Sequence, residues 1–293
     1  TLYDTANGYT TSEDRIGTAL GAVREKIILC TKSSGNTPEK MTAHLENSLK
    51  MLRTDYLDVL QIHNPSFVPK PGGEDGLYDC LLKARAQGKI RFIGITAHSR
   101  ERAREAAESG LYDVLQYPLS YLSSVEELDL ITLCQEKNVG LLAMKGLCGG
   151  LLTNIKAAFA FLRQYENVFP IWGMQKISEL DEFISYENHL PVMDEEMERA
   201  IETDRAELSG SFCRGCGYCL PCPANVPIPM AARITFLLNR SVRESFTTED
   251  WRENMRRIDG CTGCGHCKAH CPYRLDTPEL LKRQQKEYFS MLL

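Results

Sequence analysis

The sequence contains no long apolar run and no excess of positive charge. A helix that spans a bilayer needs roughly 20 consecutive apolar residues, and the apolar segments here, such as 27–33 and 56–63, have the length of buried strands. The 34 lysines and arginines are fewer than the 39 aspartates and glutamates, which leaves a formal net charge of −5. This composition gives no indication of a membrane span, of nucleic acid or of an anionic membrane as a partner.

An initiator methionine is also missing, and the first residues already have the pattern of a β-strand. We therefore expect the 293 residues to be a fragment or a trimmed product of a longer chain. The length is sufficient for one large domain and a second, small one.

Cysteine, in contrast, is abundant, with twelve residues. Eight of them form two tight clusters near the C-terminus, a pattern typical of metal ligands rather than of disulfides. We expect the other four, which lie in apolar segments, to be small buried hydrophobic residues: Cys30, Cys80, Cys134 and Cys148. Clustered thiolates favour a reducing compartment, so the sequence predicts a cytoplasmic protein.

Each cluster is a C-x2-C-x2-C triple followed by a fourth cysteine and a proline, and the second cluster begins "CTGCGHC". Such a triple can supply three of the four thiolates that a 4Fe-4S cubane needs, and in two-cluster ferredoxins the fourth cysteine ligates the other cluster. On that pattern one predicted ligand set is Cys213, Cys216, Cys219 and Cys271. The other predicted set is Cys261, Cys264, Cys267 and Cys222. Zinc is the main alternative metal.

Residues 1–190 alternate between strand-like and helix-like segments. The predicted strands are 1–6, 27–33, 56–63, 91–96, 113–118, 140–146 and 169–173. They are apolar on both faces, as parallel strands covered by helices are. The pattern predicts an α/β fold, which is either an open sheet or a TIM (β/α)8 barrel with one strand missing.

A change of composition follows the α/β region. Residues 191–210 are predicted to be a linker that contains an acidic, mostly solvated helix. Segments 228–241 and 248–259 have helical patterns and separate the two cysteine clusters. We therefore expect residues 211–293 to form a small, all-helical ferredoxin-like domain with two 4Fe-4S clusters.

Four polar residues lie at or just beyond the ends of the first three predicted strands: Asp4, Tyr9, Lys32 and His63. Each alone has an ordinary structural explanation, but parallel strands direct their carboxyl ends toward one common site. A Tyr hydroxyl can protonate a carbonyl oxygen while His hydrogen-bonds to it. A neighbouring Lys, held charged by Asp, is expected to lower the pKa of the Tyr hydroxyl. The pattern therefore predicts carbonyl chemistry.

The segments "DTANGY", "IILCTK" and "SLKMLRTDYLDVLQIHNP" resemble the aldo-keto reductase family, over roughly residues 1–190. The whole chain resembles the branch of that family with a C-terminal iron–sulfur domain. The resemblance implies a TIM barrel, a catalytic tetrad of Asp4, Tyr9, Lys32 and His63, and a first barrel strand that would precede Thr1.

The resemblance also implies a nicotinamide cofactor, either NADP or NAD, at the barrel mouth. "GITAH" (94–98) resembles the segment that holds the carboxamide, and "AMKGLCGGL" (143–151) the loop under the nicotinamide. The cofactor-binding residues that it implies are Thr96, Gln116, Met144, Gly173, Gln175 and Lys176.

Together these features predict an oxidoreductase that acts on a small carbonyl or alcohol substrate and exchanges electrons with a redox partner through its clusters. In this reading Tyr9 is the general acid or base and His63 polarises the carbonyl. The alternative is an iron–sulfur electron-transfer protein whose barrel is a non-catalytic docking scaffold. A third possibility is that the clusters only stabilise the fold.

Overall fold

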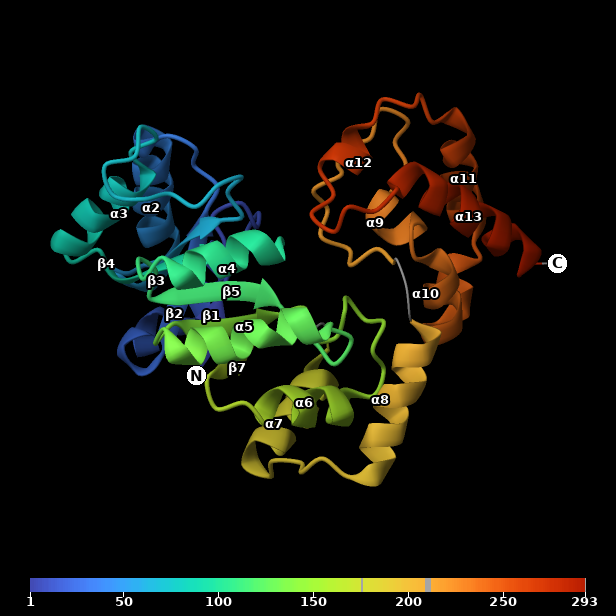
Figure 1. Ribbon diagram of the computed structural model, residues 1–293, viewed down its shortest axis with the longest axis horizontal. Coiled ribbons are helices and arrows are strands. Elements are labelled where there is room, and N and C mark those ends of the chain that lie inside the picture. The colour runs from blue at the N-terminus through green and yellow to red at the C-terminus, as the bar shows by residue number, and fades with distance from the viewer. Residues whose placement is uncertain (175, 209–211, 293) are drawn as a thin grey trace. The chain divides into compact units, whose positions relative to one another are not determined.

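The computed structural model describes residues 1–174, 176–208 and 212–292 (Figure 1). The chain divides into two compact units. We call the first the sheet unit; it comprises Thr1–Leu119, Ser123–Met144 and Tyr165–Ile171. The second, the cysteine-rich unit, comprises Ser120–Leu122, Lys145–Gln164 and Trp172–Leu293.

The sheet unit is built on one parallel sheet of seven strands. The strands are β1 (Leu2–Asp4), β2 (Ile28–Ser33), β3 (Leu57–His63), β4 (Ile90–Thr96), β5 (Val114–Pro118), β6 (Gly140–Met144) and β7 (Val168–Pro170). All seven predicted strands are thereby confirmed. They are hydrogen-bonded in sequence order, and every pair is parallel. A doubly wound sheet reverses its strand order at a switch point, so this order is that of a half-barrel.

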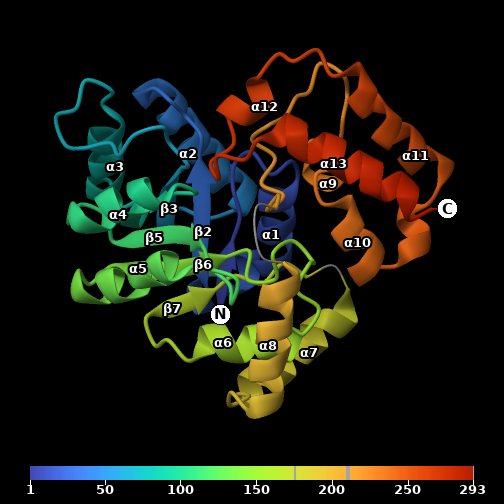
Figure 2. The ribbon, with the colours of Figure 1, turned by 45° about the vertical axis from the view of Figure 1, so that its right-hand side comes forward.

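Helices follow the strands, as the alternating pattern predicts. Those of the sheet unit are α1 (Ser12–Leu20), the short 3-10 helix η1 (Gly21–Lys26), α2 (Pro38–Leu52), α3 (Leu77–Ala86), α4 (Arg100–Glu108) and α5 (Val125–Glu136) (Figures 1 and 2). Parallel crossovers are right-handed, so strands added in one direction place their helices on one side of the sheet. The opposite side of the sheet is left for a functional site.

Helix α2 shows how local sequence sets an element. Thr37 is the N-cap, and its side chain accepts a hydrogen bond from the backbone N–H of Lys40 at 3.3 Å. Pro38 occupies the first turn, where no intrahelical N–H is required. The residues that α2 buries are Met41, Leu45, Ser48, Leu49 and Leu52, at helical spacing.

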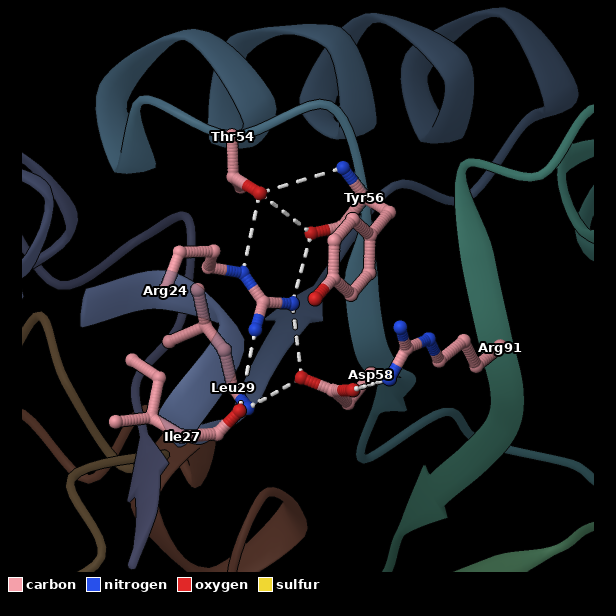
Figure 3. A network of polar contacts seen from close by, with 7 residues as sticks. All are labelled: Arg24, Ile27, Leu29, Thr54, Tyr56, Asp58 and Arg91. Atoms are coloured by element: carbon pink, nitrogen blue, oxygen red, sulfur yellow. Dashed lines mark hydrogen bonds and ion pairs between the residues drawn. The ribbon is translucent and has the colours of Figure 1, made fainter. Parts of the chain in front are cut away.

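Polar contacts join the strands at their amino ends. Figure 3 shows this network, formed by Arg24, Ile27, Leu29, Thr54, Tyr56, Asp58 and Arg91. The buried Asp58 carboxylate pairs with Arg24 at 2.8 Å and with Arg91 at 2.9 Å, and it accepts a hydrogen bond from the backbone N–H of Leu29 at 2.9 Å. Because these residues come from η1, β2, β3 and β4, the network holds this end of the sheet together.

The cysteine-rich unit is helical in its described part. Its longer helices are α6 (Ile155–Arg163), α7 (Ile177–Asn188), α8 (Glu195–Glu207) and α13 (Thr277–Ser290). Its shorter ones are α9 (Ile228–Ala231), α10 (Ile234–Arg240), η2 (Arg243–Phe246), α11 (Glu249–Arg256), η3 (Arg257–Gly260) and α12 (His266–Ala269). The predicted helix 228–241 is therefore two helices, α9 and α10, divided at Ala232 and Arg233.

Helix α8 is less solvated than the acidic sequence suggests. All its charged residues except Asp204 are exposed, and Asp204 lies with Met197 and Ile201 on one buried stripe at helical spacing. The buried Asp204 carboxylate accepts a hydrogen bond from the Tyr121 hydroxyl and pairs with Arg240 at 2.7 Å. No helix in the described ranges has both the length and the apolar character needed to cross a membrane.

Candidate active site and cysteine cavities

One side of the sheet carries an apolar layer and then a polar layer. The apolar cluster comprises Leu2, Cys30, Val59, Val114, Leu142 and Ile171. Strand side chains alternate between faces with a period of two. The residues two positions further along share that face and lie nearer the carboxyl ends: Asp4, Lys32, Gln61, Gln116 and Met144. On this face of the sheet, a polar layer at the carboxyl ends of the strands therefore lies next to an apolar layer.

Lys32 and Asp4 form the centre of this polar layer. The Lys32 ammonium lies 2.5 Å from Oδ2 of Asp4 and donates to the backbone carbonyl of Thr5 at 2.7 Å. Lys32 is only 2 % exposed. A buried ammonium needs such a partner, because removing an isolated charge from water is costly.

Tyr9 and His63 complete the group at the carboxyl ends. The Lys32 ammonium lies 5.3 Å from the centre of the Tyr9 ring. The Tyr9 and His63 rings meet edge to face, with 5.8 Å between centroids. Tyr9 as a whole is 47 % exposed. The four predicted tetrad residues thus lie together in the sheet unit.

The electrostatics differ in one respect from the sequence-based expectation. Burial raises the pKa of the Tyr9 hydroxyl, and the Asp4 carboxylate raises it further. The pKa of the Tyr9 hydroxyl is thus raised, not lowered as the sequence predicts. For His63, burial and the Lys32 charge together lower the pKa to about 4. Near pH 7 the site therefore holds a protonated Tyr and a neutral His.

Two glutamines support Asp4. The side-chain amides of Gln61 and Gln116 each donate to the Asp4 carboxylate at 3.2 Å. Within the described chain, the side-chain carbonyls of both glutamines are buried and accept no hydrogen bond. An unsatisfied buried acceptor is costly, so the Gln116 carbonyl is suited to the N–H groups of a carboxamide. The carboxamide of the nicotinamide that the family resemblance implies has N–H groups of the kind that this carbonyl needs.

Gln61 was missed by sequence reasoning, although a signal was present. It is the one uncharged polar residue in the apolar run of "LDVLQIH", two positions before His63 and hence on the same face. Gly94 on the next strand accommodates it, since a Cβ atom there would lie 2.7 Å from Cγ of Gln61.

The other predicted cofactor residues of the sheet unit lie at the same ends of strands. Thr96 ends β4, is buried, and its hydroxyl accepts a hydrogen bond from the backbone N–H of Asn64 at 2.8 Å. This contact fixes the chain directly after His63. Met144 ends β6 and is half-buried, and its backbone carbonyl accepts from Leu119 at 3.1 Å.

Gly173 and Lys176 belong to the cysteine-rich unit, and both are exposed. Gln175 lies outside the described residues. Lys176 precedes helix α7, and its backbone N–H donates to the Glu179 carboxylate at 3.2 Å. The N-terminus of a helix favours an anion. At α7 the Glu179 carboxylate already occupies this position.

The eight clustered cysteines lie around two cavities of the cysteine-rich unit. One cavity has the thiols of Cys213, Cys216, Cys219 and Cys271 in its wall. The other is lined by Cys222, Cys261, Cys264 and Cys267, and Cys219 borders it too. Each cavity therefore combines a triple with the trailing cysteine of the other segment.

The remaining walls of both cavities are mostly apolar. The first includes Ile228, Ala232, Leu275 and Leu280, and the second Val226, Ile258 and Leu281. Burial raises the pKa of the Cys219 thiol to about 12 and raises that of Cys213. A thiol with a raised pKa stays protonated near pH 7 unless a metal ion replaces its proton. Such thiols are therefore suited to bind a metal cluster. At least four cysteines line each apolar cavity, although in the part of the chain that the structure describes no three cysteine, histidine or acidic side chains are placed so that they could hold a metal ion.

The scattered cysteines have the predicted character for the most part. Cys30, Cys134 and Cys148 are buried, whereas Cys80 is partly buried. Burial raises the pKa of the Cys134 thiol to about 12, as expected for an inert core residue.

Comparisons with known proteins match two parts of the chain to two families. The model of the aldo/keto reductase family matches residues 1–159, and that of the 4Fe-4S dicluster domain matches residues 212–276. Aldo-keto reductase YhdN of Bacillus subtilis is 30% identical over 168 residues, which cover 52% of this chain and 50% of that protein. The NADH-specific methylglyoxal reductase of Escherichia coli is 28% identical over 175 residues, 52% and 54% of the two chains. The chain thus spans about half the length of these curated relatives.

Solved structures resemble the fold at low sequence identity. An aldo-keto reductase from Klebsiella pneumoniae in complex with NADPH has a TM-score of 0.60 and 22% identity, and the match covers 69% of this chain and 79% of that one. Aldo-keto reductase AKR11C1 from Bacillus halodurans has a TM-score of 0.58 and 20% identity, with 69% and 81% covered. At such identity the likeness concerns the fold alone.

Proposed function

Because the chain belongs to the aldo/keto reductase family, we propose that it is part of a nicotinamide-dependent oxidoreductase that interconverts a small carbonyl compound and its alcohol. The observation that carries the proposal is the convergence of Asp4, Lys32, Tyr9 and His63 at the carboxyl ends of β1 to β3. NADH and NADPH are both candidate cofactors, and a bound nicotinamide would supply the hydride.

Tyr9 is proposed as the general acid in the reducing direction. Its raised pKa keeps the hydroxyl protonated near pH 7, so it has a proton to give to a carbonyl oxygen as that oxygen becomes an alcohol. The Lys32 ammonium, 5.3 Å from the ring, then stabilises the negative charge left on Tyr9. Asp4, which is held by Gln61 and Gln116, keeps Lys32 in place.

His63 is proposed to polarise the carbonyl. With a pKa of about 4 it is neutral, and a neutral imidazole can donate one hydrogen bond without competing with Tyr9 as an acid. Its ring lies against Tyr9, so both groups can reach one oxygen atom. Gln116 and Thr96 are proposed to hold the carboxamide of the cofactor at the same edge.

The cysteine-rich unit is proposed to hold two 4Fe-4S clusters, which would supply one-electron transfer. Cys213, Cys216, Cys219 and Cys271 would hold one of them. Cys261, Cys264, Cys267 and Cys222 would hold the other. Two one-electron carriers match the two electrons of one hydride, so a redox partner could be served one electron at a time.

The test uses the complete natural protein, reconstituted anaerobically and screened against small aldehydes and ketones with NADH and NADPH. Tyr9→Phe should lower turnover by about 10²–10⁴-fold, the usual contribution of a general acid, with nucleotide Kd nearly unchanged. Tyr3→Phe is the matched control, because Tyr3 precedes Asp4 on β1 and points to the other face of the strand.

Two outcomes would contradict the enzymatic proposal. Turnover retained in Tyr9→Phe would remove Tyr9 from its assigned role. A wild-type protein that binds neither nucleotide but has reducible clusters would instead favour an electron carrier with a non-catalytic barrel.

A further inference from the structure

Arg233 is a buried cation of the cysteine-rich unit whose hydrogen-bond partners are uncharged. It is 6 % exposed. Its guanidinium donates to the backbone carbonyls of Cys148 at 3.1 Å and Gly149 at 3.2 Å, and contacts Sδ of Met230 at 3.5 Å. None of these partners carries a charge, and no carboxylate of the described ranges pairs with it. A buried charge without a counter-charge is costly, so this position calls for an anion.

The first cysteine triple lies directly beside this guanidinium. A Cβ atom on Gly215 would lie 3.1 Å from Cζ of Arg233, and the Gly215 backbone adopts a φ of +66°. Gly215 also donates its backbone N–H to Sγ of Cys213 at 3.4 Å. The glycine thus permits the close approach of Arg233 to the loop that carries Cys213 and Cys216.

Lys145 adds a second cation at the same place. It follows β6 directly and is half-buried, with φ at +61°. Its ammonium interacts electrostatically with the side chains of Cys216, Cys148 and Cys213. In the part of the chain that the structure describes, the Lys145 ammonium forms neither a hydrogen bond nor an ion pair, although its backbone carbonyl accepts a hydrogen bond from Cys148 at 2.8 Å. Arg214 also lines this cavity and lies 4.6 Å from the centre of the Tyr273 ring.

The surroundings of the second cysteine segment are different. Lys268 pairs with Asp276 at 2.6 Å, and Lys282, which lines the second cavity, pairs with Glu279 at 3.1 Å. Cys261 and Cys264 are exposed. Cations near these thiols are therefore neutralised by carboxylates and screened by water.

We propose that Lys145 and Arg233 raise the reduction potential of the cluster held by Cys213, Cys216, Cys219 and Cys271 above that of the other cluster. A cluster with four thiolates is anionic and gains one negative charge on reduction, so nearby uncompensated cations stabilise the reduced form. An added electron then resides at the cavity beside Lys145, which follows β6, and Arg233, which precedes α10. This inference rests on the proposed cluster ligation.

The test is a redox titration of the reconstituted full chain, monitored by electron paramagnetic resonance. Lys145→Gln and Arg233→Gln remove one charge each, while Lys145→Arg and Arg233→Lys retain it. Lys282→Gln is the matched control, because Lys282 lines the other cavity but has a carboxylate partner. Cys264→Ser assigns the signal of the second cluster, since a serine ligand alters its spectrum.

Each neutralising variant should lower the ratio of reduced to oxidised first cluster by about tenfold at a fixed potential, which is about 59 mV for one electron. In these variants the reduction potential of the second cluster should shift by less than about a third of that. The same limit should hold for the first cluster in the charge-retaining variants and in Lys282→Gln. Should Arg233→Gln fail to assemble, Lys145→Gln decides alone, because Lys145 makes no hydrogen bond that the change removes.

Equal shifts of both clusters, or no shift in Lys145→Gln, would overturn the inference while leaving the proposed function intact. A wild-type protein without any reducible iron–sulfur signal would overturn the proposed cofactors as well. The potential measurement does not depend on a carbonyl substrate, so it separates the two cases.

Discussion

At the residue scale, burial sets the protonation of the groups that would face a substrate. His63 lies at the end of β3 beside the Lys32 charge, and both features oppose its protonation. Its pKa of about 4 is below the unperturbed value of about 6.5. The imidazole is therefore a hydrogen-bond donor rather than an acid over the physiological range.

This shift predicts a particular pH dependence. Between about pH 4 and 6.5 the unfolded chain binds more protons at His63 than the folded chain does, so the free energy of unfolding should rise with pH across this window. The shift is worth on the order of 3 kcal/mol over this window, and His63→Gln should remove that part of the pH dependence of the free energy of unfolding. Urea denaturation of both proteins at several pH values measures the difference. An unchanged slope would show that His63 has an ordinary pKa.

Tyr9 and Gln61 show what a sequence pattern leaves open at this scale. The order of Asp, Tyr, Lys and His along the chain was sufficient to predict the group. The sign of the Tyr9 pKa shift was not, because it depends on the burial of the hydroxyl and on the nearby Asp4 carboxylate. Gln61 became visible only when three strands aligned their polar side chains around Asp4.

At the element scale, the amino ends of the strands are held by charge pairs rather than by apolar contacts alone. Asp58 of β3 connects Arg24 of η1, the backbone of β2 and Arg91 of β4 (Figure 3). Both Arg side chains also lie on the Tyr56 ring, at 4.0 and 4.2 Å from its centre. Since the candidate catalytic groups lie at the opposite ends of these strands, we expect this network to serve stability.

Asp58→Ala should therefore destabilise the sheet unit without touching the candidate active site. The change leaves the buried Arg24 guanidinium without its counter-charge, which costs about 3–5 kcal/mol. Arg91→Ala is the control: its side chain is 57 % exposed, and an exposed pair contributes roughly 0–1 kcal/mol. Chemical denaturation measures both values. Equal losses in the two variants would contradict the assigned role of the buried pair.

At the scale of the whole molecule, the two compact units are stabilised in different ways. The sheet unit buries a continuous apolar core beneath its helices, including Leu45, Leu57 and Ile93. In the cysteine-rich unit, one core cluster combines apolar residues such as Ile234 and Met255 with the ligand candidates Cys213 and Cys219. Its packing is therefore expected to depend on what the thiols bind.

Removal of iron with a chelator should loosen only the second of these cores. Because metal binding and folding are coupled in small metal-holding domains, backbone amides of residues 212–276 should exchange faster with deuterium in the iron-free protein. Amides of β2, β3 and β4 should keep their protection. Hydrogen exchange followed by mass spectrometry reports both regions at once. Unchanged exchange in 212–276 would indicate that the clusters contribute little to this core.

The sequence by itself determined the seven strands, the four residues at their ends and the paired cysteine segments. Those features are local: alternation of apolar runs, caps and fixed cysteine spacing depend on near neighbours in the chain. Only the tertiary structure decided which groups face each other across long sequence separations. It brought Gln116 to Asp4, and Arg233 to Cys148 and Gly215, because side-chain contacts and charge compensation are set by packing rather than by spacing.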